Sequence, residues 1–158
     1  MKTTIDTSGA REEFRKAQEL FRKEVLRRFQ YAGMEAVKIA RTTHGYMDQT
    51  GNLTSSMGAL VAEDGKVIWS TGFDAISGSA SEGPGAGQEL AQKIVSENNV
   101  GFLLVVVAGM HYASYVERGH TMKNGRFVRG RPVLSGASSQ LPTILNTLLS
   151  QLSLTGNV

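Results

Sequence analysis

The chain has 158 residues, of which 41% are hydrophobic and 20% charged, a balance typical of one soluble globular domain rather than of a disordered protein. It contains no cysteine, which excludes a disulfide framework and thiol catalysis and argues against a structural zinc site. The formal net charge is only +3, no secretory signal opens the sequence, and the longest apolar run, residues 102–108, is too short to span a bilayer. We therefore expect a single domain over residues 1–158 that folds in a cytoplasm and has no membrane partner.

The charges are distributed unevenly along the chain. Residues 1–41 carry ten Lys or Arg and six Asp or Glu, whereas residues 42–117 carry two basic residues against eight acids. Residues 118–158 carry five basic residues and no acid. Two interpretations are open: one compact surface mixes these charges, or identical copies pack head to tail, with the acidic middle of one copy against the basic end of the next.

A long amphipathic helix is predicted for residues 10–41. This stretch lacks proline, contains one glycine (Gly33), and repeats apolar residues at three- and four-residue steps. Thr7 and Ser8 offer an N-cap, and two glutamates follow in the expected first turn, where the helix dipole favours anions. Gly33 allows a bend. Because a helix of about thirty residues is long for a small domain, we expect it to pack also against something outside the domain.

A loop and a hairpin follow this helix. Residues 42–52 contain two glycines and an aspartate and are predicted to form a loop, and residues 53–57 a short turn. Residues 58–71 hold two apolar stretches separated by Asp64-Gly65, a pair that favours the tight turn of a β-hairpin.

The next segment is rich in glycine and serine. Residues 75–87 are predicted to be a flexible loop insertion because their composition resembles that of a linker. A short helix is expected over residues 88–98. Residues 102–108 are apolar without alternation, which predicts a strand that is covered on both faces and central in its sheet.

The last third of the chain contains a helical turn, a hairpin and a helix. Residues 111–118 have helical spacing that ends at Gly119, and residues 122–128 form a hairpin with Asn124-Gly125 at its tip. The C-terminal segment repeats leucine and isoleucine at helical spacing, with Pro142 expected in its first turn or at a kink. It has no charged side chain after Arg131, so we expect it to be enclosed or to lie against a partner.

These elements predict an α+β fold. A long N-terminal helix and a C-terminal helix would pack on a small, mostly antiparallel sheet, from which a hairpin protrudes.

Few side chains are suited to catalysis or metal binding. None of them has tight ligand spacing, and residues 83–87 lack the Lys-Ser/Thr that follows a phosphate-binding loop. A hydrolase that uses some of them is the weakest hypothesis, because no nucleophile–base spacing is visible. We expect no catalytic residue, no metal site and no cofactor. The candidate titratable residues are His44, Asp48, His111, Glu117 and His120.

The second hairpin is strongly basic. Alternate strand positions share a face, so Arg129 and Arg131 are expected to point the same way, with Phe127 in the same row. Three interpretations are open: an ordinary solvated hairpin, a contact with an acidic protein surface, or a contact with DNA phosphates. The candidate contact residues for assembly or DNA are Arg118, Lys123, Arg126 and Arg129.

Three motifs follow one another along the chain, namely TGNLTSSM at residues 50–57, YASYVERGH at 112–120 and RPVL at 131–134. In this order they resemble the head–tail joining (neck or tail-completion) proteins of siphophages. Two features depart from the family pattern, namely His120, where threonine is frequent, and the insertion at 75–87. The motif residues are Thr50, Gly51, Leu53, Ser56, Tyr112, Ala113, Tyr115, Glu117, Gly119, Arg131 and Pro132.

The first motif makes structural sense by itself. Thr50 and Gly51 can turn the chain sharply. Ser55 or Ser56 can hydrogen-bond to nearby backbone groups.

The second and third motifs also suggest architectural roles. Tyr112 and Tyr115 are expected to bury their rings and to keep a hydroxyl for a hydrogen bond. Glu117 is expected to pair with Arg118 and the later arginines as a hub of ion pairs. Arg131-Pro132 should lead into the last helix in an extended conformation.

The resemblance implies a structural virion protein that is not an enzyme. Its copies would form a ring of six or twelve at the phage neck or tail top, between portal-side connector proteins and the tail tube protein, with phage DNA passing through the lumen. The ring would join the virion after assembly in the host bacterial cytoplasm. The alternative is a small basic nucleic-acid-binding protein of a mobile element.

Overall fold

The computed structural model describes residues 7–152, which form five helices and five strands. Three strands make an antiparallel sheet in the order β2-β1-β3, and two shorter strands pair separately. The elements are α1 (Ser8–Thr42), α2 (Asn52–Ser55), β1 (Met57–Glu63), β2 (Lys66–Gly72), α3 (Gly83–Glu97), β3 (Phe102–Ala108), α4 (Ala113–Arg118), β4 (Gly119–Thr121), β5 (Phe127–Arg129) and α5 (Ser135–Ser150).

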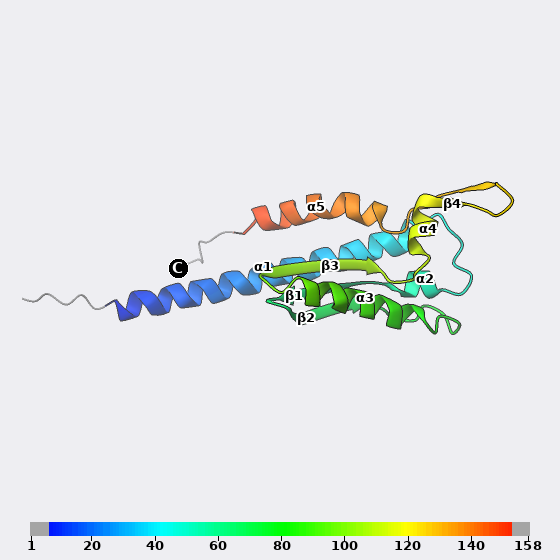
Figure 1. Cartoon of the computed structure of the whole chain (residues 1–158). Helices are drawn as coiled ribbons and strands as arrows, with labels where there is room; N and C mark the ends of the chain where they lie inside the picture. Colours follow the sequence, from blue (N-terminus) through cyan, green and yellow to red (C-terminus); the bar gives the residue numbers. More distant parts are fainter. Residues whose placement is uncertain (1–6, 153–158) are drawn as a thin grey trace, which may run out of the picture.

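The helices cover the three-stranded sheet on both faces. α1 lies on one face with α5 outside it, and α3 lies on the other face (Figure 1). Leu60 and Val105 point toward α3, where they pack with Ala91 and Val95. The predicted α+β fold, with a long N-terminal helix, a C-terminal helix and a small antiparallel sheet, is confirmed.

α1 is one continuous helix through Gly33, which is fully packed rather than a site of bending. A Cβ atom at this position would lie 3.1 Å from the ring of Trp69 and 3.2 Å from the side chains of Ala59 and Leu104. The glycine therefore lets α1 approach the sheet closely. α1 also begins at Ser8, earlier than predicted, so the two glutamates at positions 12 and 13 lie beyond its first turn.

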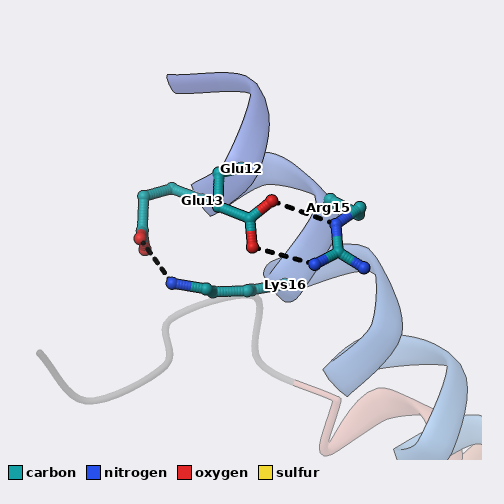
Figure 2. Close-up of polar contacts among 4 residues, drawn as sticks. All are labelled: Glu12, Glu13, Arg15 and Lys16. Atoms are coloured by element: carbon teal, nitrogen blue, oxygen red, sulfur yellow. Dashed lines mark hydrogen bonds and ion pairs between the residues drawn. The ribbon is translucent and has the colours of Figure 1, made fainter. Parts of the chain in front are cut away.

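The N-terminal half of α1 extends past the rest of the molecule (Figure 1). Residues 7–23 are all exposed, including Phe14 at 65%. Its polar side is stabilised within the helix, because Glu12 pairs with Arg15 at 2.8 Å and Glu13 pairs with Lys16 at 3.1 Å (Figure 2). The expectation that α1 packs on something outside the domain stays a prediction.

β3 is an edge strand, so the prediction that it is central is wrong. β1 is the central strand instead, and its first six residues are all buried. β3 is apolar on both sides because α1 covers one face of the sheet and α3 the other. An unbroken apolar pattern indicates that both faces of a strand are covered. It does not indicate whether the strand has a hydrogen-bonded neighbour on one side or on both.

The predicted loop over residues 75–87 is shorter in the structure, because α3 already begins at Gly83. Pro84 lies in the first turn of α3, where a missing N–H costs nothing. The side-chain oxygen of Asn52 accepts the backbone N–H groups of Glu82 (3.1 Å) and Gly83 (3.0 Å), so it caps α3 from 31 residues away. The glycines at 83 and 87 therefore belong to a helix and not to a linker.

We expect Asn52→Ala to lower the free energy of unfolding by about 1 kcal/mol, because it removes this cap. Asn52→Asp keeps the accepting oxygen and should cost less. Urea denaturation of the two variants and the unchanged chain measures the difference. Equal losses from both substitutions would show that the cap contributes nothing.

α5 lies along α1, and Ala137 is its one fully buried residue. The side chains of the predicted apolar stripe are only half-buried. The opposite side of α5 faces solvent and carries uncharged polar residues. α5 is therefore not enclosed within the described chain. Pro142 lies inside α5 and not in its first turn, because α5 begins at Ser135. None of the helices over residues 7–152 has both the length and the apolar character needed to cross a membrane.

Candidate functional site

A hairpin formed by residues 118–131, here called the basic arm, stands off the body of the molecule (Figure 1). β4 and β5 pair antiparallel, with Gly119 opposite Arg129 and Thr121 opposite Phe127. The tip closes as Asn124 accepts the backbone N–H of Arg126 through its side chain at 3.1 Å. The hairpin predicted for this segment is thus present, with β4 beginning directly at the end of α4.

The basic side chains of the arm are all exposed, and none forms an ion pair within residues 7–152. Phe127 is 62% exposed and Met122 is 44% exposed, so the arm also presents apolar surface. Exposed guanidinium and ammonium groups without a carboxylate partner attract phosphates or acidic proteins. The five side chains are Arg118, Lys123, Arg126, Arg129 and Arg131.

A hollow of about 580 Å³ separates the arm from the loop at residues 45–47. Arg126, Arg129 and Arg131 line one side, and the other side is aromatic and apolar through Tyr46 and Met47. Burial raises the pKa of Tyr46 to about 12, so its hydroxyl stays neutral. No carboxylate lines the hollow, which is suited to an anionic group with an apolar neighbour.

Glu117, at the base of the arm, is not the predicted hub of ion pairs. One of its carboxylate oxygens accepts the backbone N–H groups of Val133 and Leu134, each at 2.8 Å. Partial burial acts to raise the pKa of Glu117, but hydrogen bonds from Ser135, Leu134 and Val133 lower it by more, so the pKa lies below its usual value. The carboxylate caps α5, where the unpaired N–H groups of the helix attract an anion.

The other end of α5 is held by Arg28 of α1. Its guanidinium donates to the backbone oxygen of Leu148 at 3.1 Å and to that of Gln151 at 3.4 Å. α5 has no charged side chain of its own, so α4 and α1 supply the anion and the cation that its dipole favours.

The motif at residues 50–57 forms a turn, α2 and the start of β1. Gly51 has a φ of +77°, which a residue with a side chain rarely adopts, so the predicted sharp turn is confirmed. Asp48 fixes this turn by accepting the backbone N–H of Gly51 at 3.0 Å and that of Thr54 at 2.7 Å. The carbonyl of Thr50 accepts the hydroxyl of Ser77, and Leu53 is buried in the core.

Both serines of this motif are fully buried and bond to backbone groups, as predicted. Ser55 accepts the backbone N–H of Ile76 at 3.0 Å. Ser56 donates to the carbonyl of Leu53 at 2.7 Å and accepts the N–H of Met110 at 3.3 Å. The motif therefore joins α2 to the loop before α3 and to the segment after β3.

The tyrosines of the second motif differ in their environment. Tyr112 is half-buried, and this burial raises the pKa of its hydroxyl. Tyr115 is 60% exposed, so the prediction that its ring is buried is wrong. The ring packs edge-on against that of His120, with 6.3 Å between the ring centroids. α4 is a surface helix of six residues with none fully buried, and Tyr115 lies on its outer side. Ala113 packs against the core, whereas Pro132, which precedes α5, is exposed.

The titratable residues considered from the sequence do not form a reactive group. Over residues 7–152 no three His, Asp or Glu side chains come together in a way that could hold a metal ion. The ring of His44 stacks on that of Tyr46, with 4.3 Å between the ring centroids. The carboxylate of Asp48 accepts the backbone N–H of Gly51 in the turn before α2. His111 packs edge-on against Tyr112.

Comparison with known proteins yields no match among family models, curated proteins or solved structures. The resemblance to siphophage joining proteins therefore rests on the three motifs alone, whose side chains mostly fix turns and helix ends.

Proposed function

We propose that the chain is a structural virion protein of the phage neck or tail top, where it forms part of the ring that joins the DNA-filled head to the tail. The observation that carries the proposal is the basic arm, whose cations are exposed and form no ion pair in the described residues, and which begins next to the contact of Glu117 with Val133 and Leu134. A surface of this kind suits contact with an acidic macromolecule.

The roles of the motif residues support assembly rather than catalysis. Gly51 and Ser56 shape the turn before α2 and the backbone contacts after it, and Glu117 holds α5. These are the positions that carry the resemblance to joining proteins.

The proposed partners are further copies of the chain, in a ring of six or twelve, together with a portal-side connector protein and the tail tube protein. Phage DNA in the lumen is a further candidate for the arm, since arginines bind phosphates by charge alone. On this proposal the chain resides in the virion and needs no cofactor.

We expect Arg126→Glu combined with Arg129→Glu to leave the chain folded and to block head–tail joining, because both side chains are exposed and unpaired within the described residues. The measurement is the yield of joined particles in a phage that supplies only the variant, with heads and tails counted by electron microscopy. Arg11→Glu combined with Lys66→Glu makes the same change of charge elsewhere and is the control. Normal joining by the arm variant would contradict the proposal.

The second candidate function is binding of nucleic acid as the main activity. The arm favours it because five cations and Phe127 share one hairpin. Affinity for duplex DNA should then fall steeply as salt rises, since about five phosphates would release counterions. Absence of binding at low salt would reject this candidate.

A further inference from the structure

The carboxylates of the described chain divide into those with a partner and those without. The glutamates of α1 pair with basic residues of the same helix, and Glu63 of β1 pairs with Arg22. Asp48, Asp64 and Glu117 accept backbone N–H groups. The remaining acids of residues 7–152 are exposed. Asp74 lies near Arg41 of α1: burial lowers the pKa of Arg41, and the charge of Asp74 acts to raise it. Glu82, Glu89 and Glu97 form no ion pair in the described residues.

Two of these acids, Glu82 directly before α3 and Glu89 in its first half, are here called the acidic surface. Glu82 and Glu89 are seven residues apart, which places them on the same side of α3. Leu90, which follows Glu89 in α3, is 38% exposed, and Ile76, in the loop before α3, is 51% exposed. The surface thus combines anions with apolar side chains, as the arm combines cations with Phe127 and Val128.

The basic arm and the acidic surface lie at the same end of the molecule but on opposite sides of the sheet. The arm stands on the side of α5, whereas the loop before α3 lies on the far side of β1 and β2 (Figure 1). Within one chain they do not meet, and no ion pair joins them in the described residues. If two copies lay next to each other in the same orientation, the arm of one copy would face the acidic surface of the other.

We propose that the basic arm of one copy docks on the acidic surface of a second copy. This inference rests on the proposed function for the existence of a ring and names the contact that builds it. Different surfaces meet, so each copy keeps a free arm and a free acidic surface, and repetition closes into a ring when the rotation between copies allows it. Opposite charges orient the copies, and burial of Phe127 against Ile76 or Leu90 adds apolar contact.

The test is the mass of the purified full-length chain at low salt, measured by sedimentation over a range of concentrations. The unchanged chain is expected to associate, and to dissociate as salt rises. Arg126→Glu with Arg129→Glu, or Glu82→Lys with Glu89→Lys, should each weaken association at least about tenfold, because like charges then face each other. A chain that carries all four substitutions has complementary charges again and should regain association.

The matched control, Arg11→Glu with Lys66→Glu, should associate like the unchanged chain. Circular dichroism checks that every variant is folded. An unchanged chain that stays monomeric, or a fourfold variant that fails to regain association, would overturn the proposal.

Disulfide trapping gives a second measurement, because the chain has no cysteine of its own. A mixture of Arg126→Cys and Glu89→Cys chains should form mixed dimers on oxidation, more readily than either variant alone. Equal trapping with Lys66→Cys in place of Glu89→Cys would contradict the contact.

The arm can instead bind DNA, and the same variants distinguish this outcome. If the chain stays monomeric, binds a duplex at low salt and loses that binding with the arm substitutions, the arm is a nucleic-acid contact and the proposal fails. Failure of head–tail joining is a separate result, because it is scored in particles and not with the purified chain.

Discussion

Gly87→Ala is expected to destabilise the chain by about 3 kcal/mol and to lower Tm by roughly 10 °C, because the new methyl group meets backbone that cannot move aside. A Cβ atom at this position would overlap the carbonyl oxygen of Ser56, and it would lie 2.6 Å from the ring of Phe73. The glycine is where α3 crosses directly over the start of β1. Thermal unfolding followed by circular dichroism measures the effect.

Gly85→Ala, two residues earlier in the same helix, is the matched control. A Cβ atom there meets nothing within 4 Å. Alanine favours a helix over glycine, so this variant should be more stable than the unchanged chain by about 0.5 kcal/mol. If both substitutions had the same effect, the close approach of α3 to β1 at Gly87 would be wrong.

These glycines also show where sequence reasoning reached its limit. Residues 83–87 have the composition of a linker, and on composition alone they were predicted to be a loop. Their helical conformation depends on Asn52, which caps the helix, and on the backbone of Ser56, against which Gly87 packs. Neither contact leaves a local pattern. The one local signal for an earlier start was Pro84, which is favoured in the first turn of a helix.

Elements with a strong local pattern were predictable. The period of the apolar residues identified α1 and α5, and the turn residues Asp64-Gly65 and Asn124-Gly125 identified both hairpins. The order of strands was not predictable in this way. β3 has the apolar pattern of a strand covered on both faces, and the helices on either side provide that cover at an edge as well as at the centre.

The basic charge of the candidate site was predictable from the sequence, whereas the hydrogen bonds that hold the segment at its base were not. The sequence shows five basic residues and no acid after Glu117, which identifies the arm as basic. It also led us to predict ion pairs between Glu117 and the arginines, and that prediction is wrong, because no cation of the arm forms an ion pair in the described residues. The role of Glu117 was missed because its partners, Val133 and Leu134, are 16 and 17 residues away and use backbone N–H groups. A glutamate beside an arginine in the sequence gives no hint of such a cap.

Glu117→Ala is expected to lower the free energy of unfolding by about 2 kcal/mol, because it leaves two N–H groups at the start of α5 without their charged acceptor. Glu117→Gln keeps an accepting oxygen without the charge and should cost about 1 kcal/mol. Urea denaturation at neutral pH measures both. Glu97→Gln, at an exposed acid without an ion pair in the described residues, is the control and should have little effect.

The dependence on pH separates this cap from a simple loss of packing. The pKa of Glu117 is lower in the folded chain than in the unfolded chain, where a glutamate has a pKa of about 4.3. The stabilisation is therefore fully present above the unfolded pKa and is lost as the pH falls through the folded pKa. The difference in stability between the unchanged chain and Glu117→Gln should stay constant from about pH 6 to pH 8 and shrink below about pH 4. A difference that persists undiminished in acid would mean that the charge of Glu117 does not hold α5.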